Sequence, residues 1–237
     1  MQTLLVLLFS FLNWFTGAAE AGAPQQAELL FVGDAMQHQA QLDEALRLGD
    51  GKYYDYSDCF TLIASEIIQA DYAVVNLEVP LGGGPRYSGY PCFSAPDSYA
   101  QALQDAGFDL FLTANNHCMD YLQKGHDDTV DCFKEAGLTY AYDAVTGIYE
   151  TKGIKIGLIA VNEVEQGAAV EKIIQSDIDS LREQDADLII VCCHWGVESE
   201  TQPEDYQMVL GRKCVDWGAD LVLGSHPHVL QGIELYQ

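Results

Sequence analysis

The chain has 237 residues, of which 36 are acidic and 11 are basic, so its formal net charge is −25, and 49% of its residues are hydrophobic. This length and apolar content support one large domain or two small ones with a sizeable core. The negative charge excludes an ordinary nucleic-acid binder, because phosphates would be repelled along most of the surface. An anionic substrate would need a local positive centre, which bound divalent ions could supply.

Residues 1–23 resemble a secretory signal peptide or an N-terminal membrane anchor. Residues 4–15 are almost unbroken apolar sequence, followed by small residues with two candidate cleavage sites. The segment has no basic start and is shorter than the about 20 apolar residues of a membrane span. We expect an exported protein of the cell envelope or extracellular space, folded over residues 24–237; a cytoplasmic protein with an apolar start is the alternative.

After this leader, strand-like apolar runs alternate with amphipathic helical segments. The predicted elements are, in chain order, a strand at 28–32, a helix at 57–69, a strand at 72–75, a helix at 97–106, a strand at 110–114, a helix at 121–136, a hairpin at 148–151 and 154–161, a helix at 168–183, a strand at 188–193, a helix at 203–217 and a strand at 219–223. Residues 82–91 are rich in Gly, Pro and Tyr and indicate a loop, interpreted as a flexible lid. The alternation predicts an α/β layer architecture with some antiparallel pairing.

Five predicted strands end in side chains that can bind metals. In an open α/β sheet, ligands bind outside the carboxyl ends of the strands. Each of these residues alone is common in turns or helix caps, but five such strand ends together favour one shared site. The candidates are Asp34, Glu78, Asn116, His117, His194, His226 and His228.

The donor types in this set indicate the chemistry. Carboxylate, amide oxygen and imidazole together suit a borderline divalent ion such as Mn, Fe or Zn, and a carboxylate can bridge two ions. Two ions about 3.5–4 Å apart can activate water and neutralise charge at an attacked phosphorus or carbonyl. The sequence has no GxSxG elbow, and its seven cysteines form no CxxC pair. We therefore expect a site with two divalent ions rather than a serine nucleophile or a zinc ribbon.

Taken together, the motifs resemble those of the capsule-synthesis protein CapA family, also called poly-gamma-glutamate biosynthesis PgsA-like proteins. The resemblance covers essentially everything after residue 27. That family is similar in fold to the calcineurin-like metallophosphoesterases, which implies a four-layer αββα sandwich with mixed sheets and a two-metal site. The matching stretches are Gly33-Asp34, Asn76-Leu77-Glu78, Ala114-Asn115-Asn116-His117, His194-Trp195-Gly196 and His226-Pro227-His228-Val229.

The resemblance also implies a role for each candidate. Glu78 stands at the position of a bridging acidic ligand, and His117 matches the residue that protonates the leaving group. The superfamily's Asp-x-His opening is absent, because Met36 occupies the histidine position; His38 is the candidate substitute. The other implied metal ligands are Asp34, Asn116, His194, His226 and His228.

The implied function is a cell-envelope protein of capsule or poly-gamma-glutamate biosynthesis. Its predicted activity is metal-dependent hydrolysis of a phosphoester or an amide, with an anionic polymer or phosphoester as substrate. Envelope-complex subunits are the expected partners, and the N-terminus would provide membrane association. The alternative is a non-catalytic assembly or export subunit that retains the fold. Family members continue past the paired-histidine strand, so we expect a C-terminally incomplete domain that lacks the last strands of its sheet.

Overall fold

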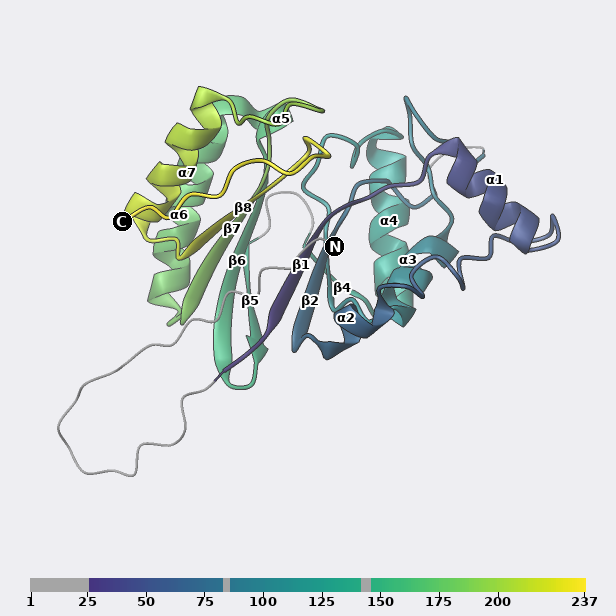
Figure 1. The fold of residues 1–237 in the computed structure, drawn as a ribbon, viewed down its shortest axis with the longest axis horizontal. Helices are drawn as coiled ribbons and strands as arrows, with labels where there is room; N and C mark the ends of the chain where they lie inside the picture. The colour runs from purple at the N-terminus through teal and green to yellow at the C-terminus, as the bar shows by residue number, and fades with distance from the viewer. Residues whose placement is uncertain (1–25, 83–85, 142–145) are drawn as a thin grey trace.

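A computed structural model describes residues 26–82, 86–141 and 146–237 of the chain. Two four-stranded sheets pack face to face in it, and helices lie against their outer faces (Figure 1). The predicted segment 1–23 lies outside the described residues. Within them, no helix has the length and apolar character needed to cross a membrane.

The first sheet is entirely parallel and has the strand order β1-β2-β3-β4. Four helices accompany it on its half of the molecule (Figure 1). The strands are β1 (Leu29–Ala35), β2 (Tyr72–Leu77), β3 (Leu110–Leu112) and β4 (Thr139–Ala141), and the helices are α1 (Gln39–Leu48), α2 (Ala64–Gln69), α3 (Asp97–Asp105) and α4 (Leu122–Ala136).

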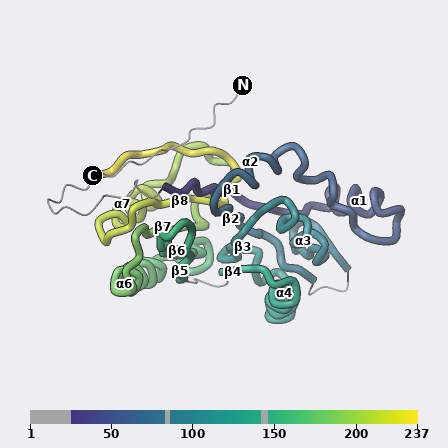
Figure 2. The backbone as a smooth tube through the Cα atoms, turned by 90° about the horizontal axis from the view of Figure 1, so that it is seen from below, coloured from purple at the N-terminus to yellow at the C-terminus, as the bar shows by residue number. Residues whose placement is uncertain are grey.

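The second sheet is mixed, with the order β5-β6-β7-β8, because β5 runs antiparallel to β6 while the other pairs are parallel. Helices α6 and α7 cover its outer face, as the view turned by 90° also shows (Figure 2). The strands are β5 (Thr146–Thr151), β6 (Ile154–Asn162), β7 (Leu188–His194) and β8 (Leu221–Ser225). The helices are α5 (Glu163–Gln166), the 3-10 turn η1 (Gly167–Ala169), α6 (Val170–Glu183) and α7 (Asp205–Trp217).

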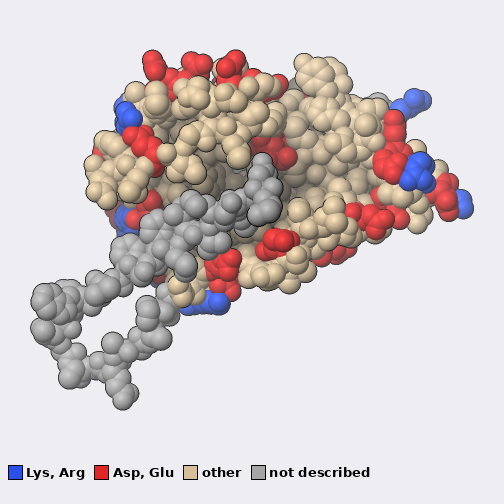
Figure 3. All heavy atoms as spheres, viewed as in Figure 1, with Lys and Arg blue, Asp and Glu red and all other residues tan. Residues whose placement is uncertain are grey.

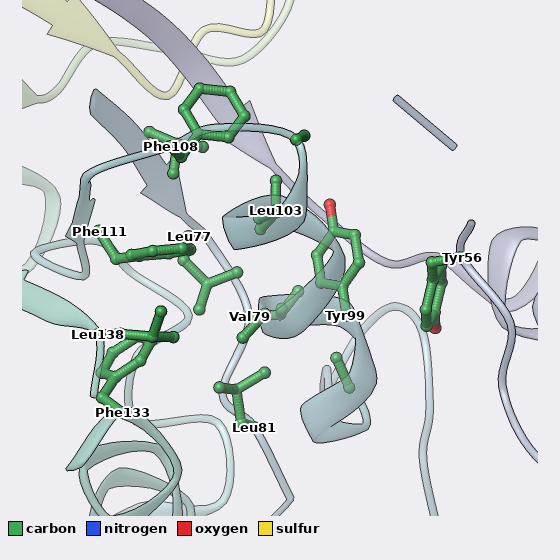
Figure 4. Packing of buried hydrophobic residues seen from close by; sticks show 14 of the residues in the cluster. Tyr56, Leu77, Val79, Leu81, Tyr99, Leu103, Phe108, Phe111, Phe133 and Leu138 are labelled. Atoms are coloured by element: carbon green, nitrogen blue, oxygen red, sulfur yellow. The ribbon is translucent and has the colours of Figure 1, made fainter. Parts of the chain in front are cut away.

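Side-chain alternation along the strands builds three apolar cores. In the first sheet, Val74 faces the opposite sheet, whereas its neighbour Val75 packs against the helices. Leu158 and Ile159 divide in the same way in the second sheet, because successive side chains of a strand point to opposite faces. Figure 4 shows the helix-side core of the first sheet, where Phe111 and Phe133 are fully buried. The three cores separate four layers, so the expected αββα sandwich is confirmed.

The amino ends of the strands are fastened by four aspartates. Each aspartate directly precedes a strand. Its carboxylate accepts a hydrogen bond of 2.8 Å from a backbone N–H at or just before the start of the neighbouring strand, and its own N–H donates to the carbonyl of that same neighbouring residue. These reciprocal pairs satisfy backbone groups that the sheet ladder leaves open. The pairs are Asp71 with Glu28, Asp109 with Ala73, Asp187 with Lys155 and Asp220 with Ile189.

The structure differs from the sequence-based expectation in several elements. The helix predicted at 57–69 begins only at Ala64. Upstream of it, the Asp55 carboxylate accepts from Ser57 N and Thr61 donates to the Asp58 carbonyl, and such local bonds compete with a helix. Sequence reasoning missed α1, which buries only Leu42 and Ala45, and the three-residue strand β4. The strand predicted at 110–114 ends at Leu112.

Candidate metal centre

Strand register brings the predicted strand ends to one edge of the molecule. In the first sheet, Asp34 pairs with Asn76. In the second, His194 of β7 lies between Asn162 of β6 and Ser225 of β8. Paired residues of parallel strands point to the same face of the sheet, and all of these residues lie at or near the carboxyl ends of their strands. The two sheets therefore present their polar residues to a common volume.

The Asp34 side chain contacts polar residues from both sheets. Its side chain is 6% exposed, and its Oδ1 accepts a hydrogen bond of 2.7 Å from Asn76 Nδ2. Its Oδ2 accepts from His226 N at 3.0 Å and lies 3.0 Å from His228 Nδ1. Burial acts to raise the pKa of Asp34, but these hydrogen bonds and the nearby imidazoles outweigh it and lower the pKa. Asp34 is thus an ionised ligand candidate.

Glu78 is fully buried, and neither of its carboxylate oxygens has a hydrogen-bond partner among the described residues. His194 Nε2 lies 3.5 Å and His228 Nε2 4.0 Å from Glu78 Oε1. Burial, with a smaller contribution from Asp34, raises the pKa of Glu78 to about 9. A buried carboxyl group without donors costs free energy, and a bound cation is the partner that would offset this cost.

The imidazoles of His194 and His226 are held in the neutral form that binds metals. Burial is the main cause that lowers the pKa of each to about 4. His194 Nδ1 lies 2.9 Å from Ser225 Oγ, and its Nε2 lies 2.7 Å from Asn116 Oδ1, so Asn116 and His194 are close enough to bind one ion together. His226 Nδ1 is buried and has no partner in the described chain.

The backbone explains how two histidines separated by one residue reach the same centre. His226 has φ 93° and His228 has φ 55°, both in the left-handed region that side chains other than glycine rarely adopt. Such a conformation costs on the order of 1–3 kcal/mol per residue and is typical of functional sites. The chain therefore turns sharply at the end of the last strand, on both sides of Pro227.

The candidate ligands form two groups. One contains Glu78, His194 and His226, and the other contains Asp34, Glu78 and His228; within each group one ligand atom per residue lies within 4.8 Å of the others. Glu78 belongs to both groups, which is the position that a bridging carboxylate would take. The donor set, the two unpartnered Glu78 oxygens and the unpartnered His226 nitrogen fit a pair of borderline divalent ions.

His117 lies beside these groups rather than in them. Its ring is almost buried, and its Nδ1 lies 3.1 Å and 3.0 Å from the two carboxylate oxygens of Asp120. Burial acts to lower the pKa of His117, but the hydrogen bond and charge of Asp120, with Glu78 and Glu198, raise it overall. Asp120 thereby fixes the ring orientation and leaves Nε2 available.

Sequence reasoning missed three residues that hold the candidates in place. Asn115 Nδ2 donates to Asn76 Oδ1 at 3.1 Å and to the Leu77 carbonyl at 2.9 Å, and Asn76 in turn donates to Asp34. Asp120 is the third. A signal was present for each: two asparagines are placed where strands end, and an acid follows His117 by three residues.

Neither ligand group contains His38 in the described part of the chain. His38 is exposed at the start of α1, where its ring packs edge-to-face on Phe93. Met36 packs against the helix-side core of the first sheet, and its carbonyl accepts hydrogen bonds from Gln37 and Tyr99. The prediction that His38 replaces the missing first-motif histidine is therefore wrong for this structure, because His38 stands at the start of α1 and its ring packs on Phe93, in the loop between β2 and α3.

Comparison with known proteins identifies the family. Residues 28–237 match the family described as bacterial capsule synthesis protein PGA_cap. The chain belongs to this family. The capsule biosynthesis protein CapA of Bacillus anthracis is 33% identical over 166 residues, which is 61% of this chain and 40% of that protein. The PGA biosynthesis protein CapA of Bacillus subtilis (strain 168) is 34% identical over 155 residues, 57% of this chain and 41% of that protein.

The matched region spans about two fifths of the length of these CapA relatives. Among solved structures, a hypothetical protein from Thermus thermophilus superposes with a TM-score of 0.50 and 20% identity, over 85% of this chain and 68% of that one. The NAD nucleotidase NadN of Haemophilus influenzae has a TM-score of 0.50 and 14% identity, over 76% of this chain and 34% of that one. At these identities the likeness concerns the fold alone, and it agrees with the metallophosphoesterase-like architecture expected for the PGA_cap family member.

Proposed function

We propose that this PGA_cap family member is a metal-dependent hydrolase of the cell envelope that cleaves a phosphoester or an amide bond during capsule polymer synthesis. The observation that carries the proposal is Glu78, a fully buried carboxyl group whose oxygens lack hydrogen-bond partners within the described residues and which belongs to both ligand groups. A purely structural role would leave the ionised form of such a group without compensation.

In this proposal Asp34, Glu78 and His228 hold one ion, and Glu78, His194 and His226, with Asn116, hold the other. The ions would supply activated water and positive charge at the attacked phosphorus or carbonyl. Asn76 and Ser225 orient Asp34 and His194 as outer partners of the ligands. His117, held by Asp120, donates a proton to the departing oxygen or nitrogen.

Charge and the names of the relatives bear on the substrate and setting that we propose. The acidic surface, on which Asp and Glu side chains outnumber Lys and Arg in the view of Figure 3, would repel an anionic polymer everywhere except at the ions. The relatives are named as capsule and PGA biosynthesis proteins, and these names support a place for the chain in capsule polymer synthesis. Within this proposal, an anionic capsule polymer or a phosphoester precursor is the substrate and envelope-complex subunits are the partners. We propose that residues 1–23 provide export and membrane association.

The decisive experiment measures metal and turnover separately. After loading with Mn or Zn, elemental analysis should find up to two ions per chain, and fewer in Asp34→Ala and His226→Ala. The control is His126→Ala, which changes a histidine of α4 that belongs to neither ligand group and should leave the number of ions unchanged. A chromogenic phosphodiester and a γ-glutamyl amide then test hydrolysis with and without chelator. Absence of bound metal contradicts the proposal, whereas bound metal without turnover of either substrate indicates the non-catalytic assembly subunit.

A further inference from the structure

Phe93 lies between two imidazoles at the border of the metal centre. Its side chain is fully buried, and its ring meets the ring of His117 edge-to-face, with centroids 4.6 Å apart and an interplanar angle of 82°. On the other side, the ring of His38 meets it at 5.0 Å and 88°. Such T-shaped pairs have a preferred geometry, so the Phe93 ring restricts rotation of the His117 ring.

The backbone of Phe93 acts on the same pair from a second direction. Phe93 N donates a hydrogen bond of 2.6 Å to Asp120 Oδ2, the oxygen that also lies 3.0 Å from His117 Nδ1. The carboxylate is thus fixed by a backbone donor while it holds the imidazole. One residue therefore contacts both members of the His117–Asp120 pair, through its ring and through its N–H.

The chain around Phe93 is anchored to the segment that carries Asp120. Cys92 Sγ donates to the Asp120 carbonyl at 2.9 Å, and Ser88 Oγ lies 2.9 Å from the Tyr121 hydroxyl. Ser88 and Ser94 also exchange backbone hydrogen bonds of 3.0 Å and 2.9 Å. In its described part, this loop is therefore fastened to the site, in contrast to the flexible lid expected from its composition.

We propose that Phe93 is a positioning residue, which holds His117 and Asp120 in the orientation required for protonation of the leaving group. This inference rests on the proposed hydrolase function. Within the described chain, the ring contacts of Phe93 are with His38, Tyr90 and His117 and its N–H bonds Asp120, none of which belongs to either ligand group. Its removal should therefore leave metal binding intact and affect the proton-transfer step. Leu at this position keeps an apolar side chain and the backbone N–H, but it lacks the flat ring that faces His117.

The test uses leaving groups of different basicity on the Zn-loaded protein. A p-nitrophenyl ester departs without a proton, whereas an alkyl ester of the same phosphate needs general acid catalysis, which contributes about 10²–10⁴-fold. Phe93→Leu should lower kcat for the alkyl ester by about tenfold or more and change kcat for the p-nitrophenyl ester by less than about threefold. The matched control is Phe133→Leu, which removes an equally buried ring from α4 and should show no difference between the two esters.

Two further measurements keep the inference falsifiable if Phe93→Leu is unstable or if neither ester is turned over. Ser88→Ala removes the bonds of Ser88 Oγ to the Cys92 carbonyl and the Tyr121 hydroxyl, and should reproduce a smaller loss that is selective for the alkyl ester. In ¹H–¹⁵N spectra of histidine-labelled protein, the Nδ1–H signal of His117, which Asp120 holds, should be sharp and protected from solvent exchange in the wild type and in Phe133→Leu, and broadened by exchange in Phe93→Leu.

An equal loss for both esters, or unchanged His117 signals in Phe93→Leu, overturns the positioning role. Lack of turnover of both esters and of the γ-glutamyl amide by the metal-loaded wild type would instead refute the hydrolase function, and the His117 spectra would still decide whether Phe93 orients this ring.

Discussion

Asp34 Oδ2 accepts a hydrogen bond from the backbone N–H of His226 at 3.0 Å, across a separation of 192 residues. This bond joins the first strand of one sheet to the residue after the last strand of the other. The candidate site consequently exists only when the two sheets have docked, and it depends on contacts between the most distant parts of the described fold. Metal binding and folding should therefore be coupled.

The first prediction concerns this coupling. Zn or Mn at about 100 times its dissociation constant should stabilise the wild type by about 2.7 kcal/mol, which raises Tm by roughly 5–10 °C for a chain of this size. Asp34→Ala should abolish most of this increase, because it removes one ligand and the bond to His226. Differential scanning calorimetry with metal and with EDTA measures it, with His126→Ala as the control that keeps the increase. An equal metal-dependent increase in Asp34→Ala would contradict the coupling.

The second prediction concerns the buried carboxyl group of Glu78. Its pKa is about 9 in the folded chain and 4.5 when unperturbed, so between these values the folded state binds more protons than the unfolded state. Stability without metal should therefore fall as pH rises through this window, by up to about 1.4 kcal/mol per pH unit. Glu78→Gln should remove this part of the decline and should also reduce metal binding.

Urea unfolding in EDTA at pH 7, 8 and 9 isolates the effect of Glu78, because His194 and His226, whose pKa values are about 4, are neutral there. The difference in unfolding free energy between Glu78→Gln and the wild type should grow with pH. Parallel stability curves for the two proteins would show that Glu78 is ionised in the metal-free fold.

The third prediction concerns Gly224 in β8. A Cβ atom there would lie 2.5 Å from Trp195 Nε1, so Gly224→Ala must displace the indole that follows His194. We expect a loss of about 1–3 kcal/mol by overpacking, together with weaker metal binding. Gly211→Ala is the matched control, because its Cβ would meet the same indole at an ordinary 3.6 Å and alanine favours the helix. Chemical unfolding and metal titration of both variants test this; equal behaviour of the two would contradict it.

The fourth prediction concerns the aspartates at the amino ends of the strands. Asp109→Ala leaves the N–H of Ala73, a fully buried residue, without its acceptor, and should cost about 1–2 kcal/mol. Metal content should not change, since Asp109 lies at the end of the sheet opposite to the ligands. Asp131→Ala serves as the comparison, because Asp131 is exposed on α4 and pairs with Lys134 at 3.7 Å. Urea midpoints should separate the two variants.

The sequence was sufficient to predict the layered fold and the residues that gather at the strand ends. Apolar alternation and strand length depend on local composition, and parallel strands bring their carboxyl ends to one edge whatever their exact bounds. This is why Asp34, Glu78, His194, His226 and His228 could be grouped before their distances were known.

The supporting hydrogen bonds could not be predicted in the same way. Asn76, Asn115 and Asp120 act through partners that only the tertiary structure selects, and an asparagine at a strand end has many possible roles. The contact between Phe93 and His117 has a related origin, because it joins a loop to a neighbouring turn. His38 was misjudged since sequence proximity to Asp34 says nothing about the turn into α1.

The four aspartates at the amino ends give the domain a chemical polarity along its strands. At that end, Asp71, Asp109, Asp187 and Asp220 already hold backbone N–H groups. At the opposite end, Glu78 offers two oxygens that no donor in the described chain occupies. The overall negative field attracts cations to the whole surface, but local hydrogen bonding decides where a cation can remain. Charge-reducing substitutions intended to improve handling of this acidic protein should therefore spare both ends of the sheets and be confined to the outward faces of the helices.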